Sequence, residues 1–365
     1  MNAALKEIIF EKIKAEDGLS VGDYMALCLG HPQYGYYNTR DPFGAQGDFT
    51  TAPEISQMFG EMVGAWIVDG WFKMGSPNPF VLLECGPGRG TLMKDIMRAA
   101  KSVPAFQEAV QIHLLEMSPV LRQVQAKTLE AYQVKWHDDL KTVPEGAPVI
   151  VVGNEFLDAL PVAQYTYGEK GWRENRLKIN SNDTLRLCVL EAEIDENAAF
   201  PVMLFPPNEG DQVEVSHEQN VFINDLSKIV LKQGGIGIFV DYGFTVPVYG
   251  TSLQGVMNHQ FVSPFEHFGE CDITAHVNFA ALGGKILENE LTLHGPVSQG
   301  DFLTRLGIVV RAEHLHKIAS GQQGQDINSA LERLVGKDTK NNQMGELFKV
   351  VGFSSYSDIQ LEGFA

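Results

Sequence analysis

The run Glu84–Gly90 constrains this chain more than any other feature, because glycine fills every second position from Gly86 onward. The run follows an apolar segment, Phe80–Leu83, that is typical of a buried parallel strand, and a helical pattern follows at Thr91–Arg98. Glycines at a strand-to-helix turn permit positive φ angles and close approach of the backbone to a ligand. The free amides at the start of the helix favour a carboxylate or a phosphate. This turn is therefore predicted to bind an anionic group.

The spacing of the glycines narrows the choice of ligand. A dinucleotide-binding turn has the pattern Gly-x-Gly-x-x-Gly, but Gly90 comes one residue too early for it, and the turn has no Walker-type lysine. A leading acid before alternating glycines is typical of proteins that bind S-adenosylmethionine. The residues expected to contact this molecule are Glu84, Gly86, Pro87, Gly88, Gly90 and Thr91. A tight turn without a ligand is the alternative.

Acids also follow the next two predicted strands. Val110–Leu115 is an apolar run that leads into Glu116, and a carboxylate at this place can accept hydrogen bonds from both ribose hydroxyls. The alternative for Glu116 is a solvated acid that favours the dipole of the next helix. After the strand Val134–Trp136, either Asp138 or Asp139 can accept from the amino group of adenine. The pattern does not decide between these two.

Composition excludes several classes of partner. The 365 residues include 28 lysines and arginines against 46 acids, a net charge of −18, which disfavours nucleic acid and suits a basic or arginine-bearing partner. The four cysteines are far apart, so neither a zinc site nor a disulfide framework is expected. No apolar run is long enough to span a membrane. The amphipathic N-terminus contains glutamates, unlike a transit peptide, and we expect a cytoplasmic protein.

The order of patterns predicts an α/β fold with additions at the front and in the middle. Residues 1–78 are expected to form an N-terminal helical and loop extension, and residues 79–365 a ligand-binding domain with a doubly wound, mostly parallel sheet. Alternating segments separated by polar turns predict an antiparallel insertion at about 162–215. A helical insertion is possible at about 310–343, and Gly321–Asp326 is expected to be a mobile loop.

Six groups of residues together resemble one known family. These are His31-Pro32 with Gly35–Tyr37, Gly47–Phe49 with Pro53–Gln57, Phe59–Glu61, Gly86–Leu92, Asn154–Phe156 with Asp158, and Asp272–Ala275. On these residues the chain resembles the MidA-like family of class I methyltransferases, whose mitochondrial members are assembly factors for respiratory complex I. The chain departs from the family at Cys85, where leucine is common. Without a transit peptide, it resembles a bacterial member.

The resemblance implies a seven-stranded class I sheet, S-adenosylmethionine as methyl donor with S-adenosylhomocysteine as product, and a donor contact from Asn154. It also implies methylation of an arginine on a protein, which in mitochondrial members is a complex I subunit. A guanidinium has a pKa above about 12 and is a poor nucleophile, so carboxylates are needed to orient it and to draw its charge to one side. The candidate catalytic residues are Glu155, Asp158, Asp48, Asp241 and His276, with Asp272 as a possible helper.

Each candidate also has a structural alternative. An acid after a strand often caps the next helix, and a lone histidine is more often part of the packing than a base. The aromatic residues Tyr34, Tyr36, Tyr37 and Phe49 can line an arginine channel or simply pack. Two rival functions stay open, a methyltransferase acting on a small molecule and a non-catalytic assembly chaperone that binds the donor. The oligomeric state is not predicted.

Overall fold

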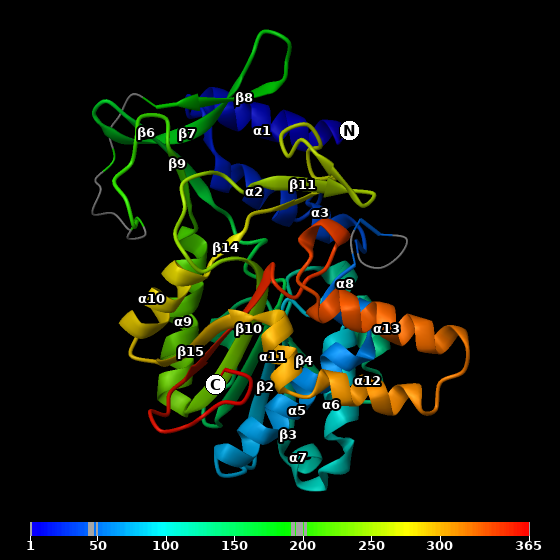
Figure 1. The fold of residues 1–365 in the computed structure, drawn as a ribbon. Coiled ribbons are helices and arrows are strands. Elements are labelled where there is room, and N and C mark those ends of the chain that lie inside the picture. The colour runs from blue at the N-terminus through cyan, green and yellow to red at the C-terminus, as the bar shows by residue number, and fades with distance from the viewer. Residues whose placement is uncertain are drawn as a thin grey trace.

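The computed structural model describes residues 2–42, 47–48, 50–190, 194, 200 and 203–364. Its main sheet has the strand order β15-β16-β10-β5-β2-β3-β4, and β14 also pairs with β10 (Figure 1). The strands are β2 (Phe80–Cys85), β3 (Val110–Leu115), β4 (Val134–His137), β5 (Val149–Asn154), β10 (Gly235–Phe244), β14 (Val277–Asn278), β15 (Thr292–Ser298) and β16 (Phe348–Ser354). The five strands from β10 to β4 run parallel, whereas β16 is antiparallel to both of its neighbours. The predicted α/β class with a mostly parallel sheet is confirmed.

Apolar side chains fill both faces of this sheet because its strands are buried on both sides. In β2, Phe80 and Leu82 belong to one core, and Val81, Leu83 and Cys85 belong to the other. The helices on the first face are α5 (Gln57–Lys73), α6 (Thr91–Ala99), α7 (Pro104–Ala109), α11 (Gln299–Arg305) and α12 (Ile308–His316). Leu129, which follows α8 (Pro119–Thr128), belongs to the same core. Those on the second face are α9 (His217–Gln233) and α10 (Phe279–Glu288). The sheet is therefore doubly wound.

The N-terminal segment and the middle of the chain form one further layer above the carboxyl ends of the parallel strands (Figure 1). The helices of this segment are α1 (Ala3–Ala15), α2 (Val21–Gly30), α3 (Tyr36–Thr39) and α4 (Ala52–Ile55). A second sheet has the order β1-β7-β6-β9, with β8 on β7: β1 (Leu19–Ser20), β6 (Ala163–Gly168), β7 (Gly171–Ile179), β8 (Leu185–Val189) and β9 (Gln212–Val215). Because β1 pairs with β7, the N-terminal extension and the middle of the chain share this sheet.

A small third sheet lies in the same layer. Its strands are β11 (Gln254–Met257), β12 (Gln260–Val262) and β13 (Asp272–Thr274), in the order β12-β11-β13. Buried residues of α1, α2 and β13, among them Leu5, Tyr24 and Ile273, share one core. This core fixes the layer above the main sheet, and so it places α2, α3 and β13 over the strand ends.

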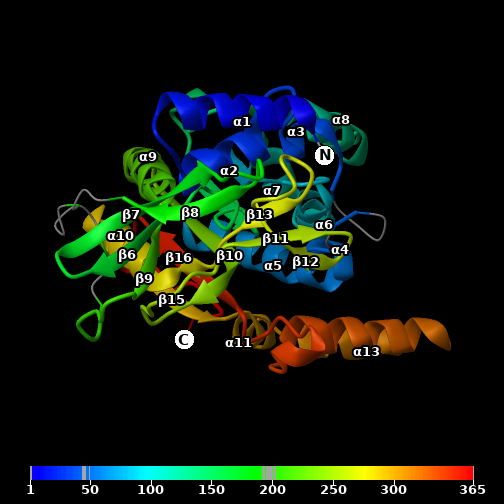
Figure 2. The same ribbon diagram turned by 90° about the horizontal axis from the view of Figure 1, so that it is seen from above.

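The predicted mobile loop at Gly321–Asp326 is wrong. Its last five residues begin α13 (Gln322–Val335), which extends away from the main sheet beside α12 (Figure 2). Gln322 donates to Asp326 one turn later at 2.9 Å, and Ile327 and Leu331 pack against the main core, so packing outweighs the two glycines. Within the described ranges, no helix is long and apolar enough to cross a membrane.

Candidate active site

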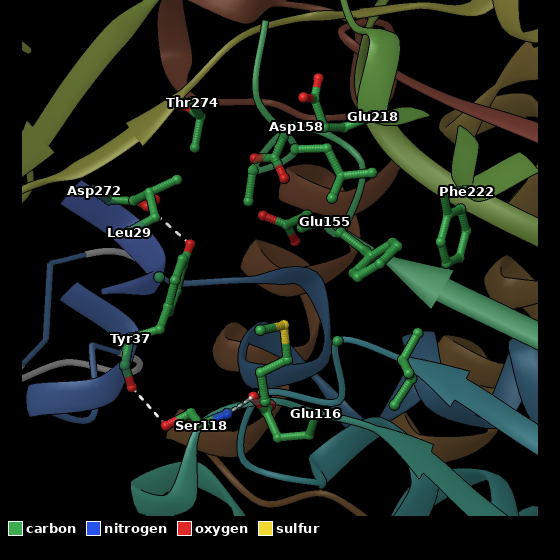
Figure 3. Close-up of a pocket in the computed structure, with 18 of the residues that line it drawn as sticks. Leu29, Tyr37, Glu116, Ser118, Glu155, Asp158, Glu218, Phe222, Asp272 and Thr274 are labelled. Atoms are coloured by element: carbon green, nitrogen blue, oxygen red, sulfur yellow. Dashed lines mark hydrogen bonds between the residues drawn. The ribbon is translucent and has the colours of Figure 1, made fainter. Parts of the chain in front are cut away.

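A cavity of about 860 Å³ lies between the strand ends of the main sheet and the layer above them (Figure 3). The predicted site residues that line it are Gly86, Gly88, Glu116, Asp138, Asp139, Glu155, Asp158 and His276. Asp272, the predicted helper, lines it as well. The other candidates, Glu84, Pro87, Gly90, Thr91, Asn154, Asp48 and Asp241, do not belong to its lining. The cavity is therefore lined both by residues predicted to bind the methyl donor and by residues predicted to be catalytic.

The glycine turn adopts the backbone conformation that its sequence predicts. Gly86, Gly88 and Gly90 have φ angles of 65°, 53° and 80°, where side chains are strained. A Cβ atom at Gly86 would also meet the ring of Phe156 at 2.8 Å. Immediately afterwards α6 begins at Thr91, whose hydroxyl donates to Glu54 of the N-terminal segment. Gly86 and Gly88 line the cavity, whereas the Gly86 amide donates to the Leu115 carbonyl and the Gly90 amide to the Pro87 carbonyl.

Glu84 stands directly before this turn with a buried carboxylate. Its exposed fraction is 2%, and its Oε2 atom has no hydrogen-bond partner within the described part of the chain. Burial, followed by the charge of Glu116, raises the pKa of Glu84 to about 8. A buried polar atom without a partner is costly, so a ligand with an N–H or O–H donor would stabilise this side chain.

Glu116 follows β3 and has one donor on each carboxylate oxygen. The Ser118 amide donates to Oε1 at 2.8 Å, and the Gln125 side chain donates to Oε2 at 3.0 Å. Burial raises the pKa of Glu116, whereas these two donors lower it. Each oxygen has two lone pairs, so the carboxylate can still accept from two hydroxyl groups at the cavity.

Gln125 belongs to no sequence motif and was not among the predicted site residues. This side chain is fully buried in α8, donates to the Gly88 carbonyl at 2.8 Å and accepts from the Trp136 indole at 2.9 Å. A signal was present, because Gln125 lies one turn after Leu121 and one turn before Leu129, both buried. A polar residue on the apolar face of a helix indicates a specific buried partner.

The two acids predicted at the adenine both line the cavity and are exposed. Asp138 forms an ion pair with Arg122 at 2.6 Å. Asp139 accepts from the Lys141 amide at 2.9 Å and so caps the short 3₁₀ helix Leu140–Thr142. The choice between the two acids stays open.

Three further carboxylates gather on the opposite side of the cavity, from Glu155, Asp158 and Asp272 (Figure 3). Burial raises the pKa of Glu155 to about 7, that of Asp158 to about 6 and that of Asp272 to about 8. The charge of Asp158 adds to this effect for the other two. Within the described ranges none of the three forms an ion pair with lysine or arginine, although the charge of Arg333 lowers the pKa of Glu155. Such a cluster is stabilised by a cation that enters the cavity.

Local hydrogen bonds fix the position of Glu155. The residue has a φ angle of 51° directly after β5, and its Oε1 atom accepts from the Ala52 amide at 3.1 Å and from the Asn154 side chain at 3.0 Å. Asn154 is thereby placed beside Glu155, outside the cavity lining. The second carboxylate oxygen of Glu155 remains available to a ligand.

The carboxylates of two predicted catalytic acids, Asp241 and Asp48, accept hydrogen bonds from other parts of the protein. Asp241 accepts at Oδ2 from the three amides of residues 156–158, at 2.9 to 3.2 Å, and at Oδ1 from the Tyr242 amide at 2.9 Å. It therefore shapes the turn that carries Glu155 and Asp158. Asp48 accepts from the Tyr36 hydroxyl at 2.6 Å and from the Asn258 amide at 2.7 Å, and so joins the N-terminal segment to the β11–β12 turn.

The remaining predicted residues divide between the cavity and the packing. His276 lines the cavity, its ring packs edge-on against Tyr242, and burial lowers its pKa. Tyr37 also lines the cavity, whereas Tyr36 and Tyr34 do not belong to the lining. Phe49 lies outside the described residues.

Tyr37 contacts both halves of the cavity (Figure 3). Its hydroxyl donates to Asp272 at 2.8 Å, and its backbone carbonyl accepts from the Ser118 hydroxyl at 2.6 Å. Because Ser118 also donates its amide to Glu116, the N-terminal segment joins the side that carries Glu116 to the side that carries Asp272.

Known proteins share this arrangement over nearly the whole chain. The family model described as S-adenosyl-L-methionine-dependent methyltransferase matches residues 62–297. The mitochondrial protein arginine methyltransferase NDUFAF7 homolog of Drosophila melanogaster is 33% identical over 95% of this chain and 84% of its own length. The chain belongs to the MidA-like family of S-adenosylmethionine-dependent methyltransferases. A second relative in this family, mitochondrial NDUFAF7 of Mus musculus, is 34% identical over 92% of this chain and 81% of its own length.

A solved structure agrees with the MidA-like assignment. A protein from Burkholderia thailandensis, crystallised with S-adenosyl-homocysteine, superposes with a TM-score of 0.86 over 99% of this chain and 94% of its own, at 27% identity. This MidA-like protein is thus a methyltransferase whose cofactor is S-adenosylmethionine. The positive-φ glycine turn and the unpartnered Glu84 carboxylate fit a ligand with a carboxylate and an ammonium group.

Proposed function

We propose that this MidA-like protein methylates the guanidinium of an arginine in a partner protein. The observation that carries the proposal is the group of three carboxylates, Glu155, Asp158 and Asp272, which face one cavity without an ion-pairing cation among the described residues. The relatives from fly and mouse are both named protein arginine methyltransferases, which supports the same acceptor. A guanidinium matches such a cluster in charge, and its planar fork can bind two carboxylate oxygens at once.

In this proposal the donor occupies the side of the cavity formed by the glycine turn. The turn amides bind its carboxylate, Glu84 binds its ammonium group and Glu116 binds its ribose, while Asp138 or Asp139 contacts adenine. Bound S-adenosylmethionine supplies an electrophilic methyl group on a sulfonium. The glycines at 86 and 88 and Glu116 support this placement because they line the same cavity as the acids.

The acids have separate tasks in the acceptor half. Glu155 orients the guanidinium, because its Oε1 atom is fixed by two donors and its Oε2 atom is left for the substrate. Asp158 and Asp272 draw positive charge toward the other guanidinium nitrogens. Transfer of the methyl group to nitrogen releases a proton, and a carboxylate with a pKa of about 7, as for Glu155, is suited to accept it.

The rim of the cavity favours a polypeptide acceptor over a small molecule. Met117, Val221 and Phe261 line the cavity and are 68%, 59% and 79% exposed, so the cavity opens to solvent between apolar side chains. A chain segment can place its arginine inside while its neighbours rest on this rim. The family resemblance makes a respiratory complex I subunit the proposed acceptor. The proposed compartment is the cytoplasm, in keeping with four free cysteines.

The test is methyl transfer by wild type, Glu155→Gln and Glu218→Gln. Labelled S-adenosylmethionine is added with each enzyme to an extract of cells that lack this protein, and labelled residues are identified by mass spectrometry. Glutamine keeps the acceptor for Ala52 and Asn154, so Glu155→Gln should remain folded and lose about 100-fold in rate or more. Glu218, an exposed acid that also lines the cavity, is the matched control and should stay active.

The outcomes separate the rival functions. Label on protein arginine, lost only in Glu155→Gln, supports the proposal. Label confined to small molecules would support the small-molecule rival, and binding of S-adenosylhomocysteine without any transfer would support the chaperone. Equal rates for wild type and Glu155→Gln would remove Glu155 from the mechanism.

A further inference from the structure

Gln125 connects two parts of the donor site from behind the cavity. Its side-chain nitrogen donates to the Gly88 carbonyl at 2.8 Å and to Glu116 Oε2 at 3.0 Å, and its oxygen accepts from the Trp136 indole at 2.9 Å. The residue is fully buried outside the cavity lining, and both N–H bonds of its amide are already used, so it does not itself contact a ligand there. Two of the three partners, Gly88 and Glu116, line the cavity.

The orientation of the Gln125 amide is determined by its partners. The Trp136 indole can only donate, so it requires the amide oxygen. The Gly88 carbonyl and the Glu116 carboxylate can only accept, so both require the amide nitrogen. A flipped amide would place its oxygen against two acceptors, and one side-chain orientation is therefore strongly preferred.

We propose that Gln125 is a positioning residue that holds the ribose-binding carboxylate of Glu116 and the glycine turn at Gly88 in one fixed arrangement. The inference rests on the proposed role of Glu116. Ser118 already donates to Oε1 of Glu116, so Gln125 is the second point that fixes the carboxylate plane. With both oxygens held from behind, their free lone pairs face the cavity, where the two ribose hydroxyls would donate.

The sharpest variant is Gln125→Glu, because it keeps size and shape and replaces the nitrogen donor by an acceptor. At about pH 8 the introduced carboxylate would oppose the Gly88 carbonyl and Glu116, so binding of S-adenosylhomocysteine should weaken about tenfold or more relative to wild type. Burial beside Glu116 would raise the pKa of the introduced carboxyl, so at about pH 5.5 its protonated form can again donate one hydrogen bond, and the difference from wild type should shrink. Gln125→Met, which has no donor at any pH, is the matched variant and should bind weakly at both.

Because neighbouring groups also titrate, the affinity of each variant is divided by that of wild type at the same pH. Glu116 faces the amide directly, and Glu84 lies close enough to influence Glu116. From α8, Arg122 donates to the Glu116 carbonyl and pairs with Asp138 beyond β4. These groups are present in every protein compared, so the ratio isolates the introduced carboxyl.

Two readouts distinguish positioning from a purely structural role. An analogue of S-adenosylhomocysteine without its ribose 2′-hydroxyl should bind wild type more weakly than the parent compound, and both Gln125 variants should lose this preference. In steady state the KM for S-adenosylmethionine should rise with little change in kcat. Trp136→Phe removes the indole donor alone, so it should reduce the preference less than Gln125→Met, and it provides a test if the Gln125 variants do not fold.

Calorimetry on folded proteins, with thermal unfolding as the check on folding, decides the outcome. The inference would be overturned if both Gln125 variants kept the affinity of wild type and its preference for the 2′-hydroxyl while Glu116→Ala bound more weakly. The ribose assignment would then remain intact. Normal binding by Glu116→Ala would instead overturn the ribose assignment and the inference with it. In the double variant Glu116→Ala with Gln125→Met, the second change should weaken binding less than Gln125→Met does alone, because part of the effect of Gln125 acts through Glu116 and the rest through Gly88.

Discussion

The two halves of the cavity are built in opposite ways. In the donor half, Gly86, Gly88 and Glu116 each lie within four residues of the end of a parallel strand, and Glu116 is matched by donors on both oxygens. In the acceptor half, Asp272 comes from a segment distant from Glu155 and Asp158, and the charge of Asp158 raises the pKa of the other two. Glu116 is thus hydrogen-bonded in the free protein, whereas the acids of the acceptor half have no ion-pairing cation among the described residues. The contrast fits a donor molecule held by directed hydrogen bonds and an acceptor recognised by its positive charge.

The largest expected effect tests the donor half. Glu116→Ala removes the acceptor for two ribose hydroxyls, so the affinity for S-adenosylhomocysteine should fall about 100-fold, since bonds to a charged group contribute about 1.5 to 3 kcal/mol each. Calorimetry measures this directly. Glu130→Ala, at an exposed acid just beyond α8, is the control and should bind as wild type does. If Glu116→Ala binds equally well, the ribose assignment is wrong.

Sequence alone predicts the backbone of the glycine turn and the place of Glu116 because these signals are local, although other predicted donor contacts lie outside the cavity lining. Glycines at 86, 88 and 90 need no tertiary information to indicate positive φ, and Glu116 is placed by the end of its strand. The acceptor half is different. Asp241 follows the same kind of pattern as Glu155, yet its carboxylate binds four backbone amides of the neighbouring turns. Only the fold shows which acid faces the cavity and which one stabilises the backbone.

Contacts between distant segments explain what the sequence missed. Gln125 belongs to no motif, and Tyr37 belongs to one that predicts at most an aromatic wall of the arginine channel. The importance of both depends on partners that are 9 to 235 positions away. Asp48 belongs to a motif of the family, but its carboxylate is held by Tyr36 and Asn258. The loop predicted at Gly321–Asp326 failed for a similar reason, because the core contacts of Ile327 and Leu331 stabilise a helix there.

A smaller effect concerns the buried charge of Asp272 in the acceptor half, and it is measured as a change in thermal stability. Burial raises the pKa of Asp272 to about 8, far above its value in the unfolded chain, so the folded state binds the extra proton. Stability is then full below about pH 4 and falls as the pH rises toward 8. Asp272→Asn removes the charge and keeps an acceptor for Tyr37, so its melting temperature should exceed that of wild type by a few degrees at pH 8 and match it near pH 4.

The control for this prediction is Asp358→Asn, at an exposed aspartate, which should leave the pH dependence unchanged. A variant that gains stability and loses methyl transfer would show that the acceptor half is strained for function. Equal melting temperatures for Asp272→Asn and wild type at pH 8 would mean that Asp272 is already compensated in the free protein.

The smallest effect concerns Tyr37, whose hydroxyl contacts the acceptor half and whose backbone carbonyl contacts the donor half. Tyr37→Phe keeps the backbone carbonyl that accepts from Ser118, and it removes only the hydroxyl that donates to Asp272. That hydrogen bond lowers the pKa of Asp272, so its loss should raise this pKa further and move the rise of arginine methylation to higher pH. At pH 7 the loss in kcat/KM should be about tenfold or less, and it should diminish at pH 9.

Binding of S-adenosylhomocysteine to Tyr37→Phe tells whether the two halves are independent. Unchanged affinity, with a shifted pH profile of transfer, means that the backbone contact to Ser118 alone supports the donor half. Tyr34→Phe, at a tyrosine outside the cavity lining, should change neither quantity. If Tyr37→Phe weakens donor binding as well, the hydroxyl couples the two halves. The hydrogen-bonded donor site and the acidic acceptor site would then form one continuous network.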